Sequence, residues 1–187
     1  MATTTAVVPE AALESSTSAV HWGAIIAGAV GAVGITFILI SLGGALGHAT
    51  VSPWSLSGGA SPKAFGRVAA IWLIVTQWLA SGLGGYLAGR MREKWVGIRT
   101  DEVVFRDTAH GFLAWALAAL IVVTLLTLGS LAAGATAAST GTVSPEAAEA
   151  ARKAASGFAF YSALSLLIGA FIASVAGALG GFHRDEM

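Results

Sequence analysis

Four long apolar stretches with almost no charge are the feature that most constrains this chain. They run over residues 22–47, 65–89, 108–134 and 157–182. Each exceeds the ~20 predominantly apolar residues that a helix needs to cross the ~30 Å hydrocarbon core of a bilayer. The only charged residue among them is Arg67, near the start of the second stretch, where its side chain can snorkel to the headgroups. The sequence therefore predicts an all-α membrane protein, a bundle of four transmembrane helices.

The composition agrees with this fold class and excludes several others. Charged residues make up 11% of the chain, against roughly 25% in an ordinary soluble domain. The formal net charge is zero, so the charge balance does not indicate a nucleic-acid partner. The chain has no cysteine, which excludes disulfides, thiolate metal sites and a thiol nucleophile.

The first 21 residues differ from the rest of the chain. Residues 1–21 are polar and contain neither Lys nor Arg, so we expect a disordered tail, followed by a transmembrane domain over residues 22–187. An alternative is that the first apolar stretch is a signal peptide. That stretch is longer than a usual signal core and no basic segment precedes it, which favours a transmembrane span.

Basic residues are unevenly divided between the two faces of the predicted bundle. Four spans place both termini and the middle loop, residues 90–107, on one side of the membrane. That side carries six basic residues, Arg90, Arg92, Lys94, Arg99, Arg106 and Arg184, against four on the other side. Because short loops rich in Lys and Arg stay in the cytoplasm, we predict a multi-pass protein of the inner membrane with both termini cytoplasmic.

The two outer connections differ in character. Residues 49–64 are rich in Gly, Ser and Pro and predict irregular structure. Residues 144–156 predict a helix, because Ser144 can cap it and Pro145 suits its first position. Glu149 precedes Arg152 and Lys153 by three and four residues, a spacing that predicts surface ion pairs. We expect a helical extension of the fourth span; a helix lying in the membrane interface is the alternative.

Small residues recur every fourth position on two of the spans. The fourth span carries Ser165, Gly169, Ala173, Gly177 and Gly181, and the second span carries Ser81, Gly85 and Gly89. Helices in lipid associate where small side chains let their backbones approach closely. These residues therefore predict tight helix packing, either within the chain or in a homo-oligomer.

The second and fourth spans also end alike. Both close with a serine, a Gly-Gly-aromatic step (Gly84-Gly85-Tyr86 and Gly180-Gly181-Phe182) and an arginine. Two duplicated helical hairpins of the same orientation would account for this pattern. Glycine-rich spans that resemble each other by composition alone would account for it equally well.

Three polar residues are candidates for a functional site. Gln77 lies near the middle of a span, where its amide needs a hydrogen-bonding partner; it is either structural or faces a cavity. Asp107 and His110 are three residues apart, so a helix would make them neighbours and the carboxylate could orient the imidazole as an acid or base. We expect both residues to anchor the loop, and the acid–base pair is the alternative.

No other pattern in the sequence predicts chemistry. It contains neither a phosphate-binding loop nor a Ser-His-Asp order. The remaining histidines, His21, His48 and His183, have no spacing typical of metal ligands. We therefore predict no catalytic, cofactor or metal site.

One segment resembles a known group of proteins. The motif is Thr100-Asp101-Glu102, Phe105-Arg106-Asp107-Thr108-Ala109-His110-Gly111-Phe112 and Trp115-Ala116, after Gly85-Tyr86 and Gly89-Arg90. This pattern resembles small multi-pass membrane proteins of alphaproteobacteria that are often labelled PhnA-like, and the similarity extends from about Trp22 to Phe182. The resemblance implies a bacterial inner-membrane location and no particular reaction.

The expected function follows from these features. We expect a non-enzymatic membrane protein, a structural or partner-binding subunit whose partners are the lipid bilayer and either a second copy or another membrane protein. The alternative is a small oligomeric transporter or channel lined by serine, threonine and Gln77.

Overall fold

The structure, a computed structural model, describes residues 18–95, 97–137 and 144–186 except for residues 51–61. Regular structure in this part of the chain is entirely helical, in four elements: α2 (Trp22–Thr50), α3 (Pro62–Arg90), α4 (Thr100–Ala137) and α5 (Pro145–Asp185). Each contains a stretch that is long and apolar enough to cross a membrane. The chain is a multi-pass membrane protein, and the predicted four-helix fold class is confirmed.

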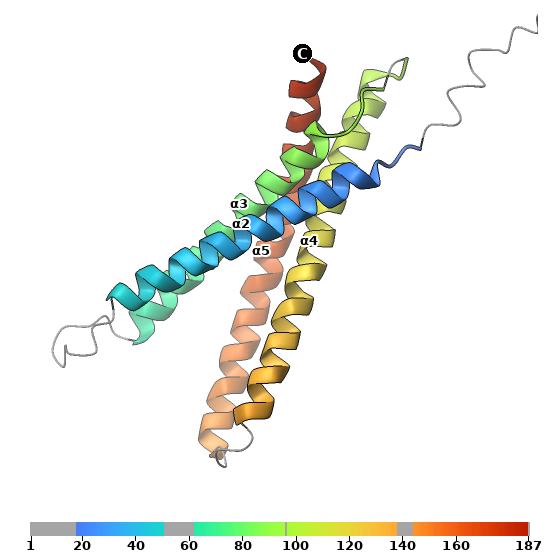
Figure 1. The fold of residues 1–187 in the computed structure, drawn as a ribbon. Coiled ribbons are helices and arrows are strands. Elements are labelled where there is room, and N and C mark those ends of the chain that lie inside the picture. The colour runs from blue at the N-terminus through green and yellow to red at the C-terminus, as the bar shows by residue number, and fades with distance from the viewer. Residues whose placement is uncertain (1–17, 51–61, 96, 138–143, 187) are drawn as a thin grey trace, which may run out of the picture.

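The helices form two antiparallel hairpins. Figure 1 shows α2 beside α3 and α4 beside α5, with the two hairpins crossing near the end that carries the C-terminus and diverging toward their far ends. At the near end α2 and α4 begin, while α3 and α5 end. The middle connection, between α3 and α4, joins the hairpins at this end. It turns at Gly97, whose φ of 84° lies in the left-handed region that glycine adopts without strain.

All the buried residues in the described part of the chain lie in the half of the bundle nearer this end, which comprises residues 22–36 of α2, 76–90 of α3, 100–122 of α4, 165–185 of α5 and the middle connection. We call it the closed half. Its apolar core is made of small side chains: Ala29 and Ala32 of α2 pack with Ala80 of α3 and Ala118 of α4. A second cluster nearer the end joins Ile25, Ala88 and Ala114. Small side chains at these positions let the helices lie close enough for dispersion contacts between backbones.

The far ends of the helices are loosely packed, and we call them the open half. It comprises residues 37–47 of α2, 66–75 of α3, 123–131 of α4 and 155–164 of α5. None of its described side chains is buried. A helix satisfies its own backbone hydrogen bonds, so it can stand in lipid with few neighbours. The two hairpins therefore pack tightly against each other in one half and diverge in the other, where α2 and α3 stay in contact through the hydrogen bond from Trp72 Nε1 to the Leu39 carbonyl at 2.8 Å.

The packing of the two hairpins differs from the packing that an exact duplication predicts. The central pair is α3 and α5, the two helices with the matching Gly-Gly-aromatic ends. Exact duplication would pack α2 against α5 as α3 packs against α4. In the described part of the chain α3 and α4 pack together, whereas α2 and α5 do not.

One helix begins earlier than predicted. The middle loop was expected to run to Asp107, but α4 begins at Thr100. Asp101 and Glu102 occupy its first turn, where acidic side chains are stabilised by the positive end of the helix dipole. The low hydropathy of this charged segment predicts a loop, whereas its acidic residues are a helix-start signal that agrees with the observed helix.

The two outer connections differ in how far the predicted structure is found. α5 begins at Pro145 and continues without a break into the fourth span, which confirms the predicted helical extension. Glu149 forms ion pairs with Arg152 at 2.9 Å and Lys153 at 3.6 Å, as its spacing predicts. In the other outer connection, α2 reaches Thr50 and α3 starts at Pro62, so the ends of the segment predicted to be irregular are helical. Residues 51–61 of that segment, and residues 1–17 of the predicted disordered tail, lie outside the described residues.

Candidate functional site

Arg92, Asp107 and Arg184 form a buried charge cluster. It lies at the outer end of the closed half, beside the middle connection, which we call the closed end. Asp107 is 2% exposed and its Oδ1 is the ion-pair partner of Arg92 Nε. The same oxygen lies 3.5 Å from Arg184 Nη1, which also donates to the Gly89 carbonyl at 2.9 Å. A buried carboxylate is tolerated where opposite charges and hydrogen bonds compensate its lost hydration. The cluster ties the middle connection, α4, α5 and the end of α3 together.

Two glycines of α5 make room for Asp107. A Cβ at Gly181 would overlap the Asp107 carboxylate, and a Cβ at Gly177 would lie 2.5 Å from the Asp107 carbonyl oxygen. Larger side chains at these positions would push α5 away from α4. The predicted small-residue stripe therefore has a second use at this end, as space for a charged side chain.

The rest of the stripe lies between α5 and its neighbours. The Gly85 Cβ position falls on the backbone of Ala173, and that of Gly89 on the backbone of Gly177. On α4, Gly111 faces the same two residues of α5. Seven of the eight predicted packing positions thus lie in contacts within the chain: Gly169, Ala173, Gly177, Gly181, Ser81, Gly85 and Gly89. The eighth, Ser165, has a buried hydroxyl without a hydrogen-bond partner in the described part of the chain.

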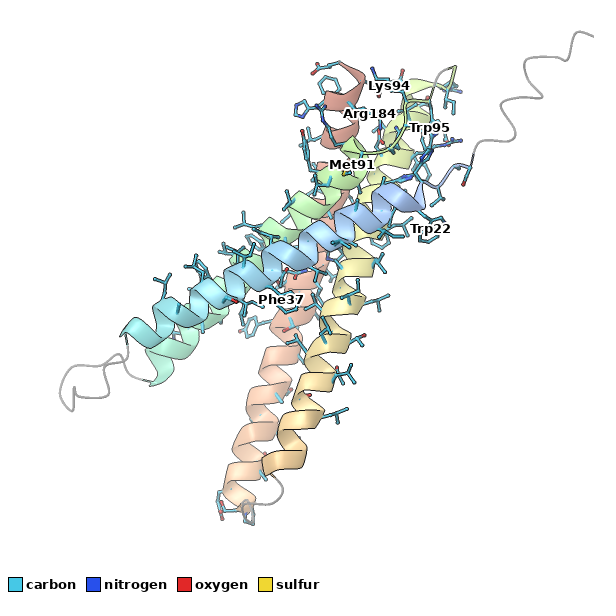
Figure 2. All side chains as sticks on the ribbon, viewed as in Figure 1. Trp22, Phe37, Met91, Lys94, Trp95 and Arg184 are labelled. Atoms are coloured by element: carbon cyan, nitrogen blue, oxygen red, sulfur yellow. The ribbon has the colours of Figure 1, made fainter. Side chains whose placement is uncertain are left out.

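An indole ring and two guanidinium groups extend the cluster outward. The Arg92 Cζ lies 3.8 Å from the centroid of the Trp95 ring, and the Arg106 Cζ lies 4.5 Å from it. Guanidinium groups at these distances are attracted to the negative face of an indole. Arg106 is also held by Glu102 at 2.6 Å. Figure 2 labels Trp95 and Arg184 at this end, where charged side chains gather around the middle connection.

His110 is oriented by two hydrogen bonds that leave neither ring nitrogen free. It is 1% exposed; its Nε2 accepts from the backbone N–H of His21 at 2.9 Å, and its Nδ1 lies 2.6 Å from the Arg106 carbonyl oxygen. A nitrogen that accepts a backbone N–H carries no proton, so Nδ1 carries it and donates to the carbonyl. His110 is therefore a neutral imidazole that fastens the start of α2 to α4.

The predicted Asp107–His110 pair does not form. Their spacing makes them neighbours on α4, but Asp107 bonds to Arg92 and Arg184 while His110 bonds to the His21 and Arg106 backbones. Asp107 takes its partners from the middle connection and α5, whereas His110 takes one from His21 and one from its own helix. This geometry gives Asp107 and His110 an anchoring role, because both side chains are buried and bonded to other groups of the chain.

The histidines are dispersed over the molecule. The His21 ring centroid lies 6.3 Å from that of His110, whereas His183 lies beside Tyr86 on the other flank, with 3.4 Å between Nδ1 and the phenol oxygen. The His48 side chain is outside the described residues. Within the described part of the chain, no group of three His, Asp or Glu side chains is placed to hold a metal ion.

A second polar region lies deeper in the bundle, where the closed half meets the open half. A cavity of about 50 Å³ is lined there by residues of all four helices, including Thr36, Gln77, Ser81, Trp115 and Leu166. Two of the hydroxyls are already used as donors: Thr36 to the Ala32 carbonyl at 2.8 Å and Ser81 to the Gln77 carbonyl at 2.7 Å. The Trp115 Nε1–H is buried without a partner in the described residues. Gln77 is thus one member of a polar group rather than an isolated amide.

Sequence reasoning missed several members of both regions. In the sequence, Arg92 and Arg184 contribute only to the basic charge of this side and Trp95 carries no prediction, because the groups they contact come from separate parts of the chain. Trp115 carried an unused signal: tryptophans concentrate at membrane interfaces, whereas this one lies well inside a span, where its N–H needs a partner.

Comparison with known proteins gives this chain no relative. It matches no family model, no curated protein and no solved structure. Functional inference therefore rests on the geometry of its own residues.

Proposed function

We propose that the chain is a non-enzymatic subunit of the bacterial inner membrane, which associates with a second copy of itself through its open half. The observation that carries this proposal is the contrast in packing between the two halves. Most of the small-residue positions that favour close helix contact are occupied inside the closed half, with Gly23 and Gly34 of α2 as exceptions. The open half therefore presents most of the surface that remains for association.

The open half carries places where another helix can approach. Each helix has one glycine there with no neighbouring atom within 4 Å of its Cβ position, namely Gly44, Gly66, Gly129 and Gly157. Large apolar side chains flank them, among them Leu42, Leu126 and Phe160. Since lipid gives helices no hydrophobic drive to associate, such gaps beside bulky side chains are what a second set of helices needs for close packing. Reciprocal contact between two open halves would form a two-fold symmetric dimer.

The proposed location follows from the charges of the closed end. Five of its basic residues lie in the short segment 90–106, next to the ends of α3 and the start of α4. The positive-inside rule then orients the closed end toward the cytoplasm. The resemblance to PhnA-like membrane proteins supports an inner-membrane location and is part of the proposal, without any phosphonate chemistry.

The absence of cysteine from the chain allows a direct test. We would introduce single cysteines in native membranes and oxidise them. Leu126→Cys and Gly129→Cys in the open half should give cross-linked dimers of this chain. Leu179→Cys, which is also exposed but lies in the closed half of α5, is the matched control and should remain monomeric. Dimers from Leu179→Cys alone would reject the open half as the interface, and a cross-link to a different protein would replace the second copy with that partner.

A second candidate function is supported by the cavity at Gln77. A polar group inside a membrane span is costly and often marks a solute path. This candidate, a small oligomeric transporter or channel, predicts solute flux in proteoliposomes that the Gln77→Leu variant abolishes. Equal flux in vesicles with and without the protein would reject it.

A further inference from the structure

The cavity between the closed and open halves contains the chemistry of a binding site. Its lining includes Thr36 of α2, Gln77 and Ser81 of α3 and Trp115 of α4, so three helices contribute polar atoms. The fourth helix lines the cavity with Leu166, and Gly169 of the same helix lies against three of the polar atoms. A Cβ there would lie 2.8 Å from Ser81 Oγ, 3.1 Å from Gln77 Nε2 and 3.1 Å from Trp115 Nε1. Three polar atoms therefore converge on one point beside the α5 backbone.

The hydrogen-bonding capacity of these atoms is partly unused. Thr36 and Ser81 donate their hydroxyl protons to backbone carbonyls of their own helices, so their oxygens retain lone pairs that accept. Trp115 Nε1–H is a donor only, and it is buried with no acceptor in the described residues. The Gln77 amide supplies both a donor and an acceptor. The site thus offers both hydrogen-bond donors and hydrogen-bond acceptors to an occupant.

The lining also restricts the charge and size of an occupant. No charged side chain lines the cavity; its other residues are alanine, valine and leucine. An ion would lose its hydration there without an opposite charge to compensate. The volume of about 50 Å³ admits roughly three to five water-sized groups, at ~10–15 Å³ for each.

We propose that this cavity binds a small uncharged molecule that both accepts and donates hydrogen bonds, with its oxygen on Trp115 Nε1–H and Gln77 and its own protons on Ser81 and Thr36. Water and small neutral solutes of the urea or glycerol class share this chemistry. The site is independent of the association proposed for the open half, and it requires no passage of solute across the membrane.

Gly169→Ala is the variant that separates ligand binding from folding. Its added methyl would occupy the convergence point, and the closest atom it meets is the Ser81 hydroxyl oxygen, which can rotate away. Gly85, Gly89 and Gly177 differ because a methyl there would strike backbone atoms of another helix. Gly157→Ala on the same helix is the matched control, since nothing lies within 4 Å of that position.

The experiment observes the Trp115 indole N–H by NMR in protein labelled with ¹⁵N-tryptophan, with Trp115→Phe assigning the signal. Two probes are used: water, through its magnetisation transfer to the indole proton, and titrated urea or glycerol, through saturable shifts of the same signal. We expect one of the two responses in wild type and in Gly157→Ala. In Gly169→Ala we expect its loss, or an apparent affinity about tenfold weaker, because the added methyl excludes the hydrogen-bonded molecule.

The outcomes are distinct. A saturable solute shift that Gly169→Ala removes identifies a small neutral solute. A water signal that Gly169→Ala removes, without a solute shift, identifies water as the occupant. If the folded wild type shows neither response, or if Gly169→Ala responds as wild type does, the proposal is wrong. The signals of the other tryptophans report in each sample that the protein is folded.

Discussion

The closed and open halves are built from the same four apolar helices, yet among the described residues only the closed half has buried side chains. In the closed half, glycine and alanine bring backbones together and Asp107 joins three segments through Arg92 and Arg184. In the open half the described side chains are larger, such as Leu126, and none is buried. Apolar content does not distinguish the halves, because lipid is as apolar as leucine. Small residues and compensated polar groups do.

The comparison also shows where a membrane protein can place a charge. The cluster sits at the end of the bundle, beside the charged middle connection, whereas the deeper cavity is lined by neutral polar groups. A charge at the middle of a span costs more than one near the headgroups. In this molecule the polar groups at the end of the bundle are therefore charged, whereas those deeper in the bundle are neutral.

The largest expected effect comes from breaking the charge cluster. Asp107→Ala leaves two buried guanidinium groups without their carboxylate, and loss of one partner of a buried ion pair costs about 3–5 kcal/mol of unfolding free energy. Reversible unfolding by SDS titration measures it. Asp101→Ala is the matched control, because the Arg99–Asp101 pair is exposed and exposed pairs contribute about 0–1 kcal/mol. Equal losses in the two variants would show that the cluster does not hold the closed half.

The next effect comes from the glycine contacts. Gly89→Ala places a methyl against the backbone of Gly177, and overpacking of a tight contact costs about 1–3 kcal/mol. Gly129→Ala, in the open half, meets no atom within 4 Å and should not lower the unfolding free energy. The same titration compares them. If Gly129→Ala were the more damaging variant, the description of the open half would be wrong.

A smaller effect is expected from truncating a large side chain in the open half. Leu126→Ala removes apolar atoms that are 63% exposed, so in monomeric protein we expect a change within about 0.5 kcal/mol. Ile25→Ala removes a fully buried side chain from the closed half and should cost about 2–5 kcal/mol, as large-to-small core substitutions do. Thermal unfolding in detergent gives both values. A dimer should make Leu126→Ala more costly than it is in the monomer.

The smallest effect concerns pH. The hydrogen bond that Arg152 donates to Glu149 lowers the pKa of the Glu149 carboxyl. A carboxyl whose pKa is lower in the folded state adds stability above its unfolded pKa, and this contribution is lost as the pH falls through the folded value. Both partners are exposed, so wild type and Glu149→Gln should unfold alike at pH 7 and also below about pH 4. A clear difference at pH 7 would mean that this end of α5 packs against something.

The sequence predicted the elements well because each depends on its own composition. The lengths of the apolar stretches predicted the four helices, and Pro145 together with Glu149 predicted that α5 starts as a helix. The spacing of Gly169, Gly177 and Gly181 predicted close packing, since small residues have few other uses in a span. These inferences needed no knowledge of which helix lies beside which.

The sites depended on contacts between helices, and there the sequence was insufficient. Nothing local indicates that Asp107 meets Arg184 rather than His110. Trp115 and Gly169 become a polar site only once α4 and α5 are packed against Gln77 of α3. Spacing along one helix predicts neighbours on that helix, and it does not rank them against partners from another.

The oligomeric mass of Gly177→Leu in nanodiscs, measured together with its unfolding free energy, tests the central claim most directly. The claim is that the small-residue face of α5 packs within the chain, since a Cβ at Gly177 meets Asp107 and Gly111 of α4. We predict the wild-type mass with a markedly lower unfolding free energy, and Gly177→Ala should show the same pattern more mildly. An oligomer that dissociates into folded monomers of unchanged stability would contradict the claim and assign this face to a subunit interface.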